Sequence, residues 1–106
     1  PSWTRRSRCT GLSLQTCEEF ARVLQSKGIK AYAGPSWHGT RDHNDPTFWH
    51  FHPCENGGIG VFVTYDSGTF DVGTLSTEAL PAALDRLRGI GEASSREEIW
   101  AALIQP

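Results

Sequence analysis

Three cysteines and four histidines are among the side chains of this 106-residue chain that could carry out chemistry. Cys17 has the most suggestive position, because Thr16 and Glu19 have the T-x-x-E spacing of a capping box at a helix N-terminus. A thiol in the first turn of a helix lies near unpaired N–H groups and the positive end of the helix dipole, which favour the thiolate. The spacing therefore predicts a cysteine nucleophile at a helix start. A free cysteine that simply packs as a small hydrophobic residue is the alternative.

A cysteine nucleophile needs a general base, usually histidine, and a polar group that orients the base. His50 and His52 alternate along a predicted strand and so share one face of it. We therefore predict His52 or His50 as the base for Cys17. Asp66 or Asp71, on the hairpin that follows, is then the orienting group, and backbone N–H groups at the helix start form the oxyanion hole. The alternatives are a half-exposed polar strand face and an aspartate that merely favours a turn.

A metal site is a further possibility, because His50, His52 and Cys54 alternate along the same segment. Their spacing is not that of a common structural zinc motif, and Pro53 can turn Cys54 away from the histidines. No organic cofactor is implied, and metal binding ranks third among the functions that the sequence suggests.

Aromatic residues in and near a polar loop predict a contact surface. Trp37 and His38 lie in the loop over residues 34–46, and Trp49 lies in the strand after it. Exposed aromatic side chains are enriched at binding sites, so these three are candidate binding residues for a protein substrate or partner. A loop of this length in so small a domain is also a candidate rim or lid.

The hydrophobic pattern predicts an α+β domain. An N-terminal helix, ending at Lys27 before Gly28, packs on a small, mainly antiparallel sheet of three to four strands, and two C-terminal helices follow. Residues 1–12 show no periodicity and are predicted as a flexible arm, and residues 13–106 form one domain. The segments that carry these predictions are strands over 29–33, 47–52, 59–65 and 69–72, a helix from Leu80 with Gly89 near its end, and a helix capped by Ser95 and Glu98.

Composition excludes several classes of protein. The net charge of −2 and the short basic run at residues 5–8 do not favour nucleic acid as a partner. No segment approaches the roughly 20 apolar residues that cross a bilayer, so we expect a soluble domain without a membrane partner. Three cysteines are too few for a disulfide scaffold. The absence of methionine, even at position 1, suggests a domain cut from a larger chain.

The segment Thr16–Ala31, a cysteine followed by a helix that ends in Gly-Ile, resembles the nucleophile segment of papain-like folds of the transglutaminase-like and papain-fold-toxin kind. The hairpin over residues 60–73 is similar to the one that delivers the histidine and acidic residue in those families. The resemblance covers residues 16–73 and implies a cysteine protease, glutamine deamidase or transamidase. It also implies the toxin or effector domain of a larger secreted bacterial protein, acting in a target-cell cytoplasm.

A protein-binding module without enzymatic activity, such as an inhibitor or an immunity-type protein, is the alternative to the cysteine hydrolase. Its contact surface would be the aromatic loop around Trp37, whereas the hydrolase would depend on Cys17.

Overall fold

The described residues of the chain form one sheet of four strands with helices packed on one of its faces. The computed structural model describes residues 2–34, 48–55, 57–65 and 69–104, and side chains there other than those of residues 2–13, 65, 69 and 70. The helices are α1 (Ser2–Ser26), the 3₁₀ helix η2 (Thr77–Ala79), α2 (Leu80–Arg88) and α3 (Arg96–Leu103). The strands are β1 (Ala31–Ala33), β2 (Phe48–Pro53), β3 (Ile59–Tyr65) and β4 (Thr69–Leu75).

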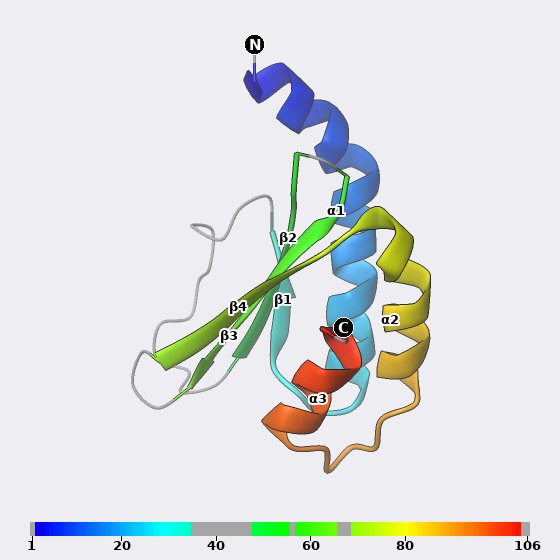
Figure 1. Ribbon diagram of the computed structural model, residues 1–106. Coiled ribbons are helices and arrows are strands. Elements are labelled where there is room, and N and C mark those ends of the chain that lie inside the picture. The colour runs from blue at the N-terminus through cyan, green and yellow to red at the C-terminus, as the bar shows by residue number, and fades with distance from the viewer. Residues whose placement is uncertain (1, 35–47, 56, 66–68, 105–106) are drawn as a thin grey trace.

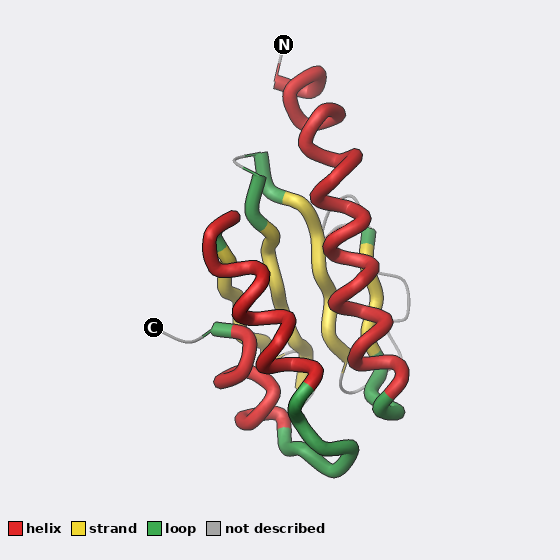
Figure 2. Tube along the Cα trace, turned by 90° about the vertical axis from the view of Figure 1, so that its right-hand side faces the viewer, coloured by secondary structure: helices red, strands yellow, loops and turns green. Residues whose placement is uncertain are grey.

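The strands lie side by side in the order β1-β2-β3-β4. β1 runs parallel to β2, and the β2–β3 and β3–β4 pairs are antiparallel. Figures 1 and 2 show α1, α2 and α3 on the same side of this sheet, with the first turns of α1 extending past its end. The predicted α+β architecture, with an N-terminal helix, a mainly antiparallel sheet and two C-terminal helices, is therefore confirmed.

The core lies between the sheet and the helices. Successive side chains of a strand point to opposite faces, so the odd-numbered residues of β2 and β3 share the helix side. Phe51 of β2 contacts Phe20 of α1 with ring centroids 5.6 Å apart, and Trp49 contacts Trp100 of α3 at 5.9 Å. The fully buried residues of this cluster include Cys17, Phe20, Leu24, Phe51, Ile59, Val61, Val63, Leu87 and Leu103.

The start of α1 differs from the prediction. The helix begins at Ser2 rather than near Cys17, so Thr16 and Glu19 lie inside it and form no N-terminal cap. Helical backbone also runs through the segment predicted as an arm, although its flexibility stays a prediction. A T-x-x-E spacing caps a helix only where the chain before it is not helical, and here the preceding residues continue the helix.

The end of α1 and the start of α3 are set by the residues next to them in the sequence. Gly28 has φ +79°, the left-handed conformation that favours glycine after a helix, as predicted. Glu98 N–H donates to Ser95 Oγ at 3.1 Å and Ser95 N–H donates to Glu98 Oε1 at 2.7 Å, so the predicted capping box of α3 is confirmed. Among the helices of the described residues, none is long and apolar enough to cross a membrane.

The hydrogen bonds of β2 fix the direction of the backbone groups in the whole sheet. Cys54 N–H donates to Gly58 O at 2.9 Å, which extends the β2–β3 register by one pair. Antiparallel pairs alternate between hydrogen-bonded and non-hydrogen-bonded. Because Cys54 and Gly58 form a hydrogen-bonded pair, the other even-numbered pairs of β2 and β3 are hydrogen-bonded as well. On the other side of β2, Trp49 N–H donates to Lys30 O at 3.0 Å, as this alternation requires. The odd residues of β3 consequently bond β4.

Replacement of Ser95 by alanine removes the side-chain oxygen that caps α3. We expect Ser95→Ala to lower the free energy of unfolding by about 1 kcal/mol, because one N–H of the first turn loses its acceptor. Urea denaturation followed by circular dichroism measures the change. Ser94→Ala is the matched control and should change the free energy of unfolding by less than about 0.5 kcal/mol. Equal effects of the two substitutions would contradict a capping role for Ser95.

Candidate functional site

Cys17 lies in the interior of α1 and faces the core. Its side chain is fully buried, and burial raises the pKa of its thiol to about 12, with the nearby Cys54 thiol and the Glu18 carboxylate adding to the effect. The burial of Cys17 and the raised pKa of its thiol both disfavour the thiolate. A helix interior also offers no free N–H groups to stabilise an oxyanion. Cys17 therefore packs as a small hydrophobic residue in this structure.

His50 and His52 lie on the opposite face of the sheet from Cys17. The His50 ring contacts the Phe62 ring at 5.0 Å and the His52 ring at 6.1 Å, whereas Phe51 between the histidines contacts α1. Because the sheet separates the two faces, the predicted pairing of Cys17 with His52 or His50 is not formed. Alternation along β2 correctly predicted that the histidines share a face, but that face is not the one that carries α1.

The histidine face is largely apolar around His50, which is 1% exposed. Burial lowers the pKa of His50 to about 4, and the neighbouring His52 adds to this. His50 Nδ1 and Thr64 Oγ1 are buried without a hydrogen-bond partner in the part of the chain that the structure describes. His52 lies over Gly60, where a side chain would collide with the imidazole. Burial also lowers the pKa of His52, partly offset by a hydrogen bond with the Pro53 backbone.

Of the other predicted site residues, Trp49 and Asp71 lie among the described residues. Trp49 is 1% exposed in the core, so its predicted exposure as a binding residue is wrong. Asp71 is half-buried on β4. Asp66, Trp37 and His38 lie outside the described residues. Within the described ranges, no group of three or more His, Cys, Asp or Glu side chains could hold a metal ion, so His50, His52 and Cys54 form no such group.

The edge of the sheet at β4 is open. The odd residues of β4 bond β3, so the N–H and C=O groups of Phe70, Val72 and Thr74 point away from the sheet. No strand among the described residues pairs with this side of β4. Val72 is 64% exposed, whereas the other large apolar side chains whose burial is described are buried or partly buried. Sequence patterns predicted the strand but could not place it at an edge.

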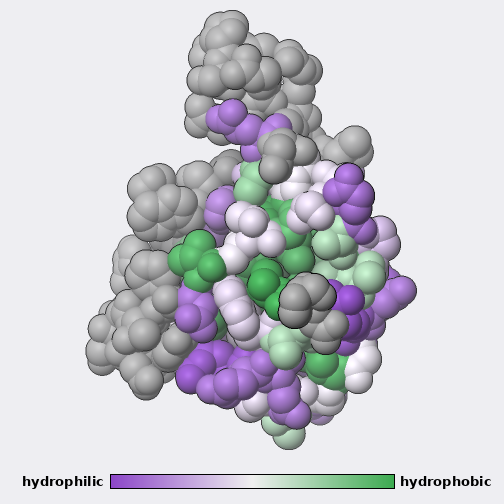
Figure 3. Space-filling model, viewed as in Figure 1, coloured by the Kyte–Doolittle hydropathy of each residue, from purple (hydrophilic) through white to green (hydrophobic). Residues whose placement is uncertain are grey.

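Apolar groups border the β4 edge on both faces of the sheet. Val72 lies on the face away from the helices, and on the helix side a Cβ at Gly73 would lie 3.0 Å from Ile104 Cδ1 and 3.3 Å from Trp100 Cζ2. Ile104 and Trp100 are themselves only partly buried. Figure 1 views the molecule from its β4 edge, and Figure 3 shows apolar residues at the centre of this view with polar ones beside them.

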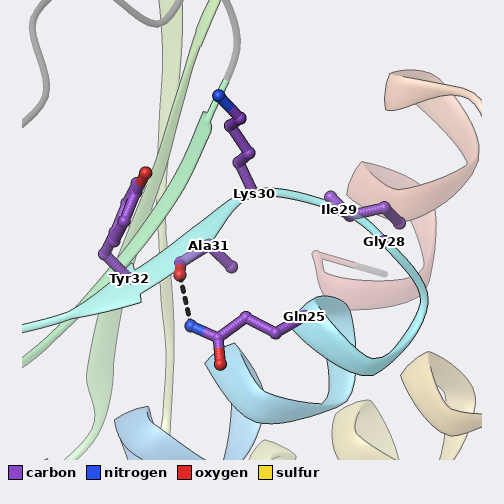
Figure 4. Close-up of a pocket in the computed structure, with 6 residues that line it drawn as sticks. All are labelled: Gln25, Gly28, Ile29, Lys30, Ala31 and Tyr32. Atoms are coloured by element: carbon purple, nitrogen blue, oxygen red, sulfur yellow. Dashed lines mark hydrogen bonds between the residues drawn. The ribbon is translucent and has the colours of Figure 1, made fainter.

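The opposite edge, at β1, is short and partly blocked. Lys30 O accepts from Trp49 N–H and Gly34 N–H donates to Phe51 O, so Ala31 lies between the residues that bond β2 and its carbonyl points outward. Gln25 Nε2 donates to this carbonyl oxygen at 2.7 Å (Figure 4). The hollow beside it, of about 280 Å³, is formed by residues 28–32 and Gln25. A backbone group satisfied within the chain cannot serve an incoming strand, so β4 is the candidate functional edge.

Comparison with known proteins gives no matching family model, no matching curated protein and no matching solved structure.

Thiol reactivity tests the position of Cys17. With its pKa at about 12, roughly 10⁻⁴ of the Cys17 side chains are thiolate at pH 8, and burial further limits access. We expect iodoacetamide to modify the half-buried Cys54 long before Cys17 in the native protein, as read by peptide mass mapping. In urea the two thiols should react at similar rates. Selective alkylation of native Cys17 below about pH 7 would instead indicate an activated nucleophile.

Stability should fall with acidity because of His50. Its folded-state pKa of about 4 lies below the ordinary 6.5, so the unfolded chain binds the proton more tightly between these values. This contribution is present above about pH 6.5 and is lost as the pH falls towards 4, a total of about 3 kcal/mol. Urea denaturation of wild type and His50→Phe across this range measures it, since carboxylate titrations cancel in the difference. A difference that does not change with pH would contradict a buried neutral His50.

Proposed function

We propose that this chain is a protein-interaction module that binds an extended polypeptide segment along the outer edge of β4. The observation that carries the proposal is the outward direction of the Val72 and Thr74 backbone groups, together with the 64% exposure of Val72. It refines the non-enzymatic binding module that the sequence left open and moves the contact surface from the aromatic loop to the sheet edge.

Strand addition accounts for the chemistry of this edge. An unpaired edge strand presents a regular row of N–H and C=O groups, which is a template for another strand. An incoming segment exchanges water for main-chain hydrogen bonds, and its alternate side chains meet the surfaces on either side of the edge. β4 is seven residues long, which is enough for several such bonds.

The surfaces beside the edge indicate the chemistry of the segment. On the face away from the helices, an incoming side chain would meet Val72, and on the helix face it would meet Ile104 and Trp100. The charged group of this strand is Asp71, half-buried on the helix side. A segment with small or β-branched apolar residues, and with no acidic residue opposite Asp71, fits these surfaces best.

The papain-like cysteine hydrolase stays a prediction from the sequence resemblance. The burial of Cys17, its raised pKa and the position of His50 and His52 across the sheet weigh against it. None of these observations bears on the β4 edge, so the interaction module is the function that the geometry supports best.

Peptide selection tests the module. From a displayed library of random peptides, we expect wild-type protein to enrich extended, β-prone sequences. Val72→Pro removes an outward N–H without removing a bond to β3, and should weaken binding of the enriched peptides about tenfold or more in a calorimetric titration. Val72→Thr keeps the N–H and the β-branched shape and is the matched control, with binding close to wild type. Peptides that bind Val72→Pro as tightly as wild type would place recognition elsewhere.

A further inference from the structure

We propose that the segment bound at the edge is β4 of a second copy of this chain, paired antiparallel about a two-fold axis at Val72. This inference rests on the proposed function and names its partner. Val72 is the central residue of Thr69–Leu75, so a two-fold axis at this residue pairs the whole strand with its copy.

The direction of the backbone groups agrees with this axis. In a two-fold antiparallel pair centred on Val72, Val72 faces its own copy and Phe70 faces Thr74 of the second copy. These three residues are the ones whose N–H and C=O groups point outward, so each of them exchanges two hydrogen bonds with the residue opposite. An axis at Asp71 or Gly73 would also pair outward-facing residues, but it would pair residues 69–73 or 71–75 only, and an axis at Asp71 would set the two Asp71 carboxylates directly opposite each other.

The side chains are also self-complementary in this register. Asp71 faces Gly73 of the second copy, so the two carboxylates are not directly opposite each other. Val72 packs against the second copy's Val72, and the apolar side chain that is 64% exposed in one copy becomes covered. An axis at Phe70 or Thr74 pairs still fewer residues of the strand.

The two-fold axis is perpendicular to the sheet, so the helices of both copies lie on the same face of one continuous sheet. Trp100 and Ile104, beside Gly73 in each copy, then border the junction on the helix side, and the two Val72 side chains border it on the other. A junction of one strand and these few side chains is small, so we expect a dimer that dissociates on dilution rather than an obligate one.

Opposite charges introduced at Val72 test the two-fold pairing of β4. Because Val72 faces itself only under this two-fold axis, Val72→Lys or Val72→Glu places like charges opposite each other and each variant should be a monomer. An equimolar mixture of the two places lysine opposite glutamate and should dimerise again. Sedimentation equilibrium from about 1 to about 500 µM, at low and high salt, measures both results against wild type. Val72→Thr should still dimerise, and Val72→Pro should not.

The outcomes separate the inference from the proposed function. Wild type that stays monomeric over this range, a mixture that fails to dimerise, or a Val72→Pro variant that dimerises like wild type would overturn pairing between copies. Selected peptides that bind wild type and lose affinity for Val72→Pro would then leave the interaction module intact with another partner. Failure of both experiments would remove the β4 edge as a functional site.

Discussion

The alternation of β2 is the constraint on which the rest of the structure depends. Odd and even residues of β2 differ in two respects: their side chains point to opposite faces of the sheet, and their backbone groups bond opposite neighbouring strands. Trp49 and Phe51 pack under the helices and bond β1, whereas His50 faces away from the helices and bonds β3. A slip by one residue would send every side chain to the other face, so the aromatic core holds the hydrogen-bond directions in place as far as β4.

The same alternation explains why Cys17 does not meet His50 or His52. Cys17 belongs to the helix that covers one face, and His50 and His52 belong to the other face. In a single four-stranded layer no side chain reaches across the backbone, so the order of these residues along the sequence carries little information about their contact. Burial then acts on each separately, raising the pKa of the thiol and lowering that of His50.

Short sequence patterns predicted most of the helices and strands. They could not predict how these elements pack on and pair with one another. The Ser95–Glu98 capping box, Gly28 and the apolar run of β3 each have a local physical cause and were predicted correctly. The Thr16–Glu19 spacing is equally local but lies within a longer helix, so it misplaced the helix start. Trp49 shows the other limit, because alternation defines two faces without saying which one the helices cover. Strand order, which makes β4 an edge, depends on long-range pairing alone.

Proteins commonly protect edge strands with proline, with charge or with a neighbouring segment, and the two edges of this sheet differ in that respect. At β1, Gln25 satisfies an outward carbonyl. At β4, Asp71 is the protective device, and it acts selectively. A partner strand that placed an acidic side chain opposite its carboxylate would bring like charges together, whereas a strand with glycine there adds no charge. β4 itself carries glycine at the position that the two-fold register brings opposite Asp71. The two-fold register therefore meets the charge constraint that Asp71 places on a partner strand.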